Sequence, residues 1–162
     1  VALVLQDVFL FSDTIYNNVV LDKEIPIKEV RNAAKAIGLE GFIEQLPGGY
    51  KYNVRERGVM LSSGQRQLIA FLRAYVCNPS LLILDEATSS VDIQTENLIK
   101  QSINKLTVGR TSIIIAHRLA TIQNADKILV IDQGRIVESG KHSDLLKQRG
   151  LYSRLCELQF SI

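Results

Sequence analysis

The chain has 162 residues, 46% hydrophobic and 22% charged, which fits one globular domain with a sizeable core. Its formal net charge of +2 is too small to indicate nucleic acid or an anionic membrane surface as a partner. No apolar run approaches the ~20 residues that span a bilayer, so no transmembrane segment is predicted.

The start of the chain and its cysteines set two further limits. The opening sequence, VALVLQ, lacks the Met and charged leader of a signal peptide and indicates a strand already under way. We therefore expect the chain to be a piece of a longer protein. Cys77 and Cys156 have no CxxC spacing and no His neighbours, which favours two reduced thiols in the cytosol over a disulfide or a metal site.

Mainly helical structure is predicted for the first part of the chain, after a short buried strand at residues 1–5. Residues 8–20 suit a loop and a short helix, and helical apolar spacing followed by glycine predicts a helix over residues 28–37. A short helical turn is expected over residues 41–46, whereas residues 50–59 are polar and irregular.

A longer helix is predicted over residues 62–78. Ser62 and Gln65 have the spacing of a capping box at its start, and the Pro that follows Asn78 ends it. The apolar run at residues 81–84 then indicates a buried strand, which leads directly into Asp85 and Glu86.

The rest of the chain alternates helices and short apolar strands. Asp92 can cap a helix that runs to about residue 106. There follow a strand at 112–116, a short helix at 119–124, a hairpin of strands at 127–131 and 135–138, and terminal helices at 143–147 and 152–158. This alternation predicts an α/β fold with a mostly parallel sheet covered on both faces, which a helical insertion at residues 8–80 interrupts.

Asp85 and Glu86 come at the C-terminal end of a buried strand, the edge where open α/β sheets bind ligands. An Asp there can hold Mg²⁺, directly or through water, and the adjacent Glu can polarise a water for attack on a terminal phosphate. The alternative is that both carboxylates merely cap the following turn. These residues alone leave both readings open.

The start of the helix at residue 62 has a different chemistry. The first amides of a helix lack internal partners, and the helix dipole makes that end positive. Gly64 lets a phosphate approach the backbone, and the Ser63 hydroxyl can donate a hydrogen bond to it. The alternative is an ordinary N-cap with no ligand.

Three further polar residues have both a structural and a functional interpretation. His117 and Gln6 follow strands, so each could reach a phosphate or a water, or could be an ordinary surface residue. Asp92 could be only an N-cap. Because Gln6, Asp85, Glu86 and His117 all fall at C-terminal strand ends, one edge of the sheet collects them, which favours a shared nucleotide site. The phosphate loop GxxxxGK(S/T) is absent from the 162 residues.

These motifs together resemble the nucleotide-binding domain of ATP-binding cassette (ABC) transporters over nearly the whole chain. Leu61-Ser62-Ser63-Gly64-Gln65 is similar to the family signature LSGGQ, with Ser63 in place of its first Gly. The other matching motifs, in the family's order, are Gln6 as the Q-loop glutamine, residues 81–86 as the Walker B strand, Ser90-Val91-Asp92 as the D-loop and His117 as the switch histidine.

The subfamily that the chain resembles most is the exporter type. The residues that carry this likeness are Gln6-Asp7, Leu10-Phe11, Thr14-Ile15 and Asn18, then Glu56-Arg57-Gly58, and in the tail Gly140-Lys141-His142, Leu145-Leu146 and Gly150-Leu151-Tyr152. In exporters the Glu-Arg-Gly segment faces the coupling helices of the membrane domain. Arg55 departs from the Gly that usually precedes that segment.

The resemblance implies an incomplete RecA-like P-loop NTPase core with an inserted helical subdomain. Residues 8–80 would form the helical and signature subdomain, and residues 1–7 and 81–162 the remainder of the core and the C-terminal helices. It also implies that the parent transporter lies at the cytoplasmic face of the cell membrane, attached to a transmembrane domain, with no nucleic-acid partner.

The family mechanism implies a head-to-tail dimer with ATP and Mg²⁺ between two nucleotide-binding domains. Glu86 would be the general base and His117 the γ-phosphate sensor, while Asp85 and Gln6 would serve the metal. Nucleotide contacts would also come from Gln6 and Asp92, and the signature residues Ser62, Ser63, Gly64 and Gln65 would face the ATP of the opposite domain.

The family's phosphate loop and adenine-stacking aromatic lie N-terminal to Gln6, so we expect the isolated chain to hydrolyse ATP negligibly. The phosphate-loop strand normally lies inside the sheet, between the strand before His117 and the strand at residues 127–131. Its absence predicts a gap in the sheet, a rearranged pairing or an intermolecular contact.

Two other classes of function remain open from the sequence. A soluble ABC ATPase of DNA repair or translation would share the Walker B strand and the signature, but would not be expected to carry the exporter-like segments at residues 11–15 and 56–58. A non-catalytic interaction module is the second alternative. The transported substrate cannot be read here, because the residues that contact it belong to the membrane domain.

Overall fold

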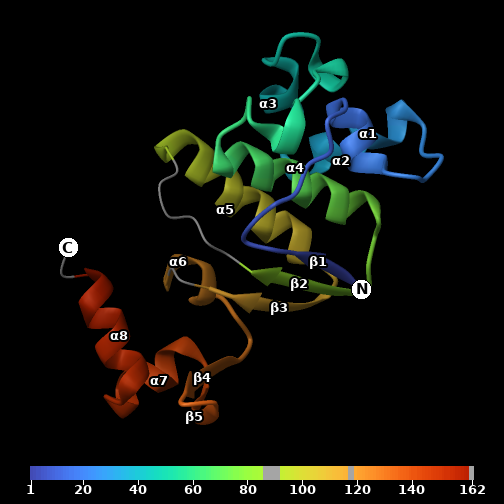
Figure 1. The fold of residues 1–162 in the computed structure, drawn as a ribbon. Coiled ribbons are helices and arrows are strands. Elements are labelled where there is room, and N and C mark those ends of the chain that lie inside the picture. The colour runs from blue at the N-terminus through green and yellow to red at the C-terminus, as the bar shows by residue number, and fades with distance from the viewer. Residues whose placement is uncertain (86–91, 117–118, 161–162) are drawn as a thin grey trace. The chain divides into compact units, whose positions relative to one another are not determined.

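The computed structural model describes residues 1–85, 92–116 and 119–160, and the chain forms two compact units, Val1–Ile115 and Ala116–Ile162 (Figure 1). Glu86 and His117, two of the expected site residues, lie outside the described residues. None of the described helices is both long and apolar enough to cross a membrane.

The first unit is built on a three-stranded parallel sheet in the order β1-β2-β3. Its strands are β1 (Ala2–Val4), β2 (Leu81–Asp85) and β3 (Thr111–Ile115). The register pairs Val4 with Leu84 and Asp85 with Ile115, so the three C-terminal strand ends lie at one edge. Parallel neighbours require long crossovers, and here helices supply them: α1 to α4 between β1 and β2, and α5 between β2 and β3.

The helices of the first unit match the predicted ones to within a few residues at each end. Their bounds are α1 (Ile15–Val20), α2 (Ile27–Ile37), α3 (Glu40–Glu44), α4 (Ser63–Val76) and α5 (Ile93–Thr107), with 3₁₀ turns η1 (Gly49–Lys51) and η2 (Glu56–Gly58) in the irregular segment. α2 ends at Gly38, whose φ of 83° is the left-handed conformation of a glycine C-cap.

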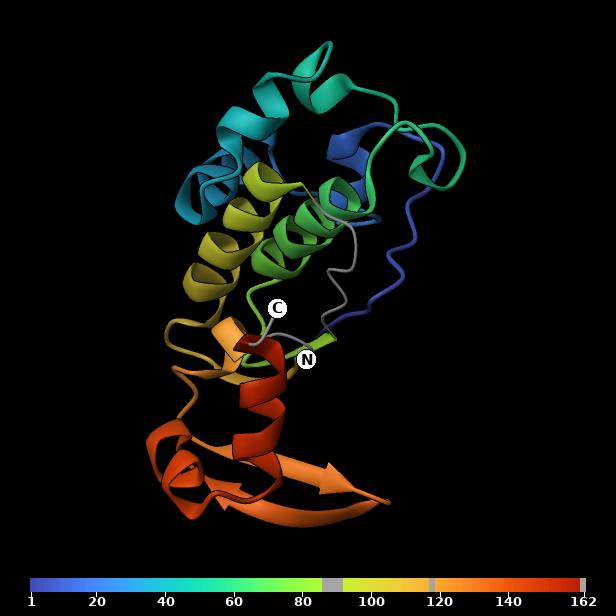
Figure 2. The same cartoon turned by 90° about the vertical axis from the view of Figure 1, so that its left-hand side faces the viewer.

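Helix α4 forms the centre of the core. It packs against α1, α2, α5 and β1, and Leu68, Phe71 and Leu72 are fully buried. Figures 1 and 2 show α4 and α5 side by side over one face of the sheet. Leu82 and Leu84 of β2 point into this layer and are also buried. The apolar spacing that predicted α4 therefore faces the core, as an amphipathic pattern should.

The helices of the first unit cover one face of its sheet, so the expected cover on both faces stays a prediction. Leu3, Ile113 and Ile115 are 56%, 52% and 51% exposed, although they are as apolar as their buried neighbours. The reason is that burial alternates along β1 and β3, so only one face meets the helices of this unit. Within the part of the chain that the structure describes, β3 pairs with β2 alone, which agrees with the predicted gap in the sheet.

The second unit contains a separate antiparallel pair, β4 (Ile128–Asp132) and β5 (Arg135–Gly140). Gln133 and Gly134 both have positive φ, 47° and 76°, as the two central residues of a tight hairpin turn require. The helices of this unit, within the residues that the structure describes, are α6 (Leu119–Ile122), α7 (His142–Gln148) and α8 (Leu151–Phe160). Its small core consists of Ile128, Val130, Leu145, Tyr152 and Cys156.

A carboxylate from β5 holds the start of α8. The two oxygens of Glu138 accept the backbone N–H groups of Leu151, at 2.5 Å, and Tyr152, at 3.1 Å. These amides have no partner inside the helix, and the helix dipole favours an anion there. A Cβ atom at Gly150 would overlap the same carboxylate, so glycine leaves the space for the contact.

We predict that Glu138→Ala lowers the free energy of unfolding by about 1 kcal/mol, because two helix amides lose their acceptor. Gly150→Ala should cost a similar amount, since its methyl group displaces the carboxylate. The double variant should cost little more than either single change, and urea unfolding of all four proteins measures this cycle. Fully additive losses would contradict the shared cause.

Candidate nucleotide site

The C-terminal edge of the three-stranded sheet brings two of the expected site residues together. Gln6 lies just beyond β1 and is exposed, whereas Asp85 is the last residue of β2 and is half-buried. Because β1 and β2 are parallel neighbours, their ends meet at the same edge, as the sequence predicted.

The donors at this edge suit a magnesium ion. Asp85 offers carboxylate oxygens and Gln6 a carboxamide oxygen, which are the hard ligands that Mg²⁺ prefers. Among the described residues, no group of three His, Cys, Asp or Glu side chains is placed to hold a metal ion. One or two protein oxygens are nevertheless the usual share for Mg²⁺, since waters and substrate phosphates complete its shell.

The first turn of α4 has the predicted capping box. Ser62 Oγ accepts the N–H of Gln65 at 3.2 Å, and Gln65 Oε1 accepts the N–H of Ser62 at 3.0 Å. The oxygen of the Gln65 side chain is therefore occupied within the turn, whereas its NH2 group can still donate. Ser63 is exposed, and its hydroxyl has no hydrogen-bond partner among the described residues. The amides of Ser63 and Gly64, at the first positions of the helix, have no partner inside it. These groups can donate hydrogen bonds to an anion.

Asp92 is the N-cap of α5, which was one of its two readings from sequence. Its Oδ1 accepts the N–H of Thr95 at 2.9 Å. The same backbone hydrogen bond holds the pKa of the Asp92 carboxyl below its usual range. Asp92 is nevertheless exposed.

A buried asparagine that sequence reasoning did not place in the site holds the loop after β1. The Asn18 amide accepts the N–H of Phe11 at 2.8 Å and donates to the carbonyls of Phe11 and Thr14, each at 3.0 Å. Arg73 of α4 donates to the Asn18 carbonyl at 2.8 Å. The segment that follows Gln6 is therefore tied to the central helix. A polar residue beside the apolar Val19 and Val20 was the available signal.

The segment before α4 is a tight turn with an unusual backbone. Arg55 has φ 62° and ψ −176°, a region that glycine alone occupies without strain. Gly58, at φ 68°, leaves no room for a side chain, because a Cβ atom would come within 2.9 Å of Leu10 and 3.0 Å of Arg66. Arg66 also donates to the Leu61 carbonyl at 2.8 Å. The turn therefore packs directly on the first turns of α4.

Comparisons with known proteins agree with this arrangement of motifs. The profile of the ABC transporter family matches residues 1–89. The chain is 47% identical over 162 residues to the uncharacterized ABC transporter ATP-binding protein YknV of Bacillus subtilis, covering 99% of this chain and 27% of YknV. It is 50% identical to an ATP-dependent lipid A-core flippase of Shewanella oneidensis, covering 99% of this chain and 27% of the flippase.

A bacterial Atm1-family ABC exporter, solved with ATP bound, has a similar structure. The two share a TM-score of 0.86 and 44% sequence identity over 98% of this chain and 28% of that chain. The chain therefore belongs to the ABC transporter family. It spans only about a quarter of the length of the relatives that it matches.

We predict that Arg55→Gly raises the free energy of unfolding by about 1 kcal/mol, because glycine relieves the backbone strain at this position. Arg55→Ala is the matched control, since alanine removes the charged side chain but keeps the Cβ atom. Urea unfolding distinguishes the two variants. An equal gain from alanine would show that the side chain, and not the backbone, causes the effect.

Proposed function

We propose that the chain is the C-terminal part of the ATP-binding and ATP-hydrolysing domain of an ABC exporter. The observation that carries this proposal is the likeness, along almost the whole chain, to an Atm1-family exporter with ATP bound. The sheet edge with Gln6 and Asp85 and the exposed start of α4 support it, since each offers groups that suit a nucleotide and its metal.

Each residue of the sheet edge has a proposed part in ATP hydrolysis. Glu86, next to Asp85, takes a proton from the water that attacks the γ-phosphate, and His117 donates a hydrogen bond to that phosphate. Asp85 and Gln6 hold Mg²⁺, which when bound neutralises phosphate charge. The bond between the β- and γ-phosphates breaks, and ADP and phosphate leave.

In this proposal the start of α4 contacts a second ATP molecule, not the one at its own sheet edge. Its free amides, positive helix end and Ser63 hydroxyl bind the ATP held by the opposite domain of a head-to-tail dimer. Ser62 and Gln65 act through the capping box, which fixes the shape of that turn. Asp92, exposed at the start of α5, faces the same dimer interface.

The proposed partners are a second nucleotide-binding domain and a transmembrane domain, which place the parent protein at the cytoplasmic face of the cell membrane. One relative is named a probable multidrug resistance transporter and others lipid A-core flippases. Because these names differ in substrate, we assign no substrate to this chain. Residues 8–80, which contain α1 to α4, are the proposed helical subdomain that meets the membrane domain.

We predict that Glu86→Gln in the full-length protein lowers ATP hydrolysis at least a hundredfold while ATP still binds, because the general base is lost. Phosphate release and equilibrium binding of a fluorescent ATP analogue measure the two effects. The 162-residue chain alone should show negligible turnover, since it contains no GxxxxGK(S/T). Turnover by the purified chain that Glu86→Gln abolishes would overturn this expectation.

Substitutions of two adjacent serines distinguish nucleotide binding from capping of the helix. We predict that Ser63→Ala in the full-length protein lowers kcat/KM for ATP about tenfold, because one hydrogen bond to a charged phosphate is lost. In the 162-residue chain, the same change should leave the free energy of unfolding nearly unchanged.

Ser62→Ala is the matched variant and should lower the free energy of unfolding by about 1 kcal/mol, because α4 loses its N-cap. Urea unfolding of the chain measures both effects on stability. A loss of stability in Ser63→Ala, with full ATPase activity, would assign Ser63 to the fold and not to the nucleotide.

A further inference from the structure

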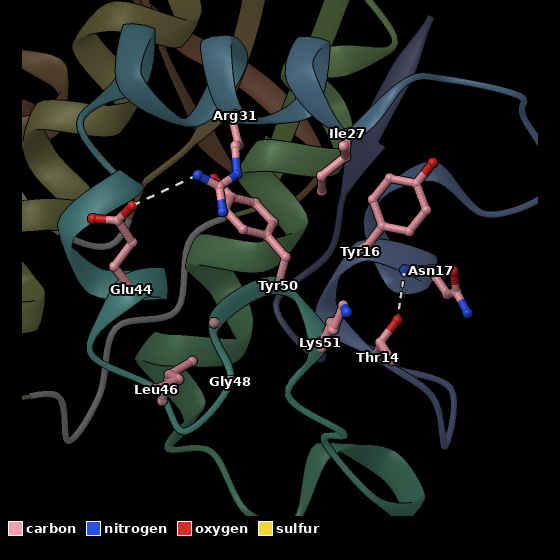
Figure 3. A pocket seen from close by; sticks show the side chains of 11 residues that line it. Thr14, Tyr16, Asn17, Ile27, Arg31, Glu44, Leu46, Gly48, Tyr50 and Lys51 are labelled. Carbon is pink, nitrogen blue, oxygen red and sulfur yellow. Dashed lines mark hydrogen bonds and ion pairs between the residues drawn. The ribbon is translucent and has the colours of Figure 1, made fainter.

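A pocket of about 700 Å³ opens on the first unit, away from every residue assigned to the nucleotide site. Figure 3 shows its walls: α2 above, α3 and the loop around Gly48 on one side, and the start of α1 on the other. Its lining includes the apolar or aromatic side chains of Tyr16, Ile27, Leu46 and Tyr50, of which Tyr50 is almost fully buried. This volume falls in the range of small-molecule sites in proteins.

The floor of the pocket, formed by Tyr50, is positioned by a turn whose backbone conformation favours glycine. Gly48 and Gly49 have φ of 86° and 56°, and this turn returns the chain so that the Tyr50 ring lies beneath Arg31. The guanidinium carbon of Arg31 is 5.3 Å from the ring centroid. Ile27 and Arg31, one helical turn apart, form the facing wall.

The charge of Arg31 is already balanced. Its Nη1 lies 4.0 Å from a carboxylate oxygen of Glu40 and 4.0 Å from one of Glu44. The Tyr50 hydroxyl donates to the other oxygen of Glu40 at 2.5 Å. Burial, and next this hydrogen bond, raise the pKa of Tyr50, so the phenol stays neutral at physiological pH. Two carboxylates therefore accompany one guanidinium, so this cluster has a formal net charge of −1.

The mouth of the pocket, by contrast, carries an unbalanced positive charge. Lys51 is exposed and has no ion-pair or hydrogen-bond partner in the described part of the chain. Beside it, Thr14 Oγ1 accepts the N–H of Asn17 at 3.1 Å, which leaves the hydroxyl hydrogen free to donate (Figure 3). A cation and a donor at the rim, beside the apolar side chains of Tyr16 and Ile27, complement a ligand with a small anionic head and an apolar body.

We propose that this pocket binds a small organic monoanion, a carboxylate attached to a flat aromatic body. The body lies against Tyr16 and Ile27, and the carboxylate pairs with the Lys51 ammonium and accepts from Thr14. This site is independent of the proposed ATPase activity, because none of its residues belongs to the sheet edge or to the start of α4.

The probe that tests the proposal is 2-naphthoate, with neutral 2-naphthamide as its matched analogue. Both are titrated into the ¹⁵N-labelled 162-residue chain, and amide chemical shifts are recorded. We expect 2-naphthoate to shift the amides of residues 14–17, 27–31 and 48–51, and to bind at least fivefold more tightly than the amide. Added ATP should leave this affinity unchanged.

Three lysine variants test whether the Lys51 ammonium binds the carboxylate. Lys51→Ala should weaken 2-naphthoate binding about tenfold, or about 1.4 kcal/mol, whereas Lys28→Ala removes an exposed lysine of α2 that does not line the pocket and should have no effect. Lys51→Arg should retain binding within about threefold. Equal affinities for the two probes, unchanged binding by Lys51→Ala, or shifts confined to other surfaces such as the sheet would each overturn the proposal.

Discussion

The burial of α4 is the constraint on which the rest of the first unit depends. Leu68, Phe71 and Leu72 pack among α1, α2, α5 and β1, which fixes the direction of the helix. Isolated helices of this length are only marginally stable in water, so the hydrophobic core is what keeps its first turn formed. Packing of the helix and the capping box together hold the first turn of α4 in place. An N-terminus held in this way can present its partial charge to an anion without being reordered.

Much of this unit was predictable because its patterns have a single physical cause. The capping box at Ser62 and the helical apolar spacing that follows it admit few alternatives, and both were confirmed. Which strand residues the helices of this unit cover was not predictable, because Ile113 and Leu82 have the same apolar character, and a strand sequence does not say which neighbours it meets. Contacts between distant residues, such as Glu138 with the start of α8, leave no periodic signal at all. Glu86 and His117 remain predictions, since both lie outside the described residues.

The motif residues differ in whether their side chains already make hydrogen bonds within the protein. Gln65 and Asp92 belong to motifs that the sequence assigned to the nucleotide, yet each has a side chain engaged in capping a helix. Such a residue contributes to ligand binding chiefly by fixing backbone geometry, because its hydrogen-bonding capacity is partly used. Ser63 differs in that its hydroxyl is exposed and without a partner among the described residues. The substitution of Ser for the usual Gly in the signature therefore adds a donor where the family has only backbone.

The loop after β1 connects the sheet edge with the pocket on α1, and its geometry argues that the two sites act separately. Coupling between sites requires an element with two arrangements that each ligand prefers differently. Asn18, fully buried, holds this loop through hydrogen bonds to Phe11 and Thr14, while Arg73 ties its carbonyl to α4. A second arrangement would leave buried polar groups unpaired, at a cost of about 1–3 kcal/mol for each group. A ligand bound as proposed would touch Thr14, whose carbonyl Asn18 already holds, so the hydrogen bonds of Asn18 oppose any shift of the loop toward Gln6.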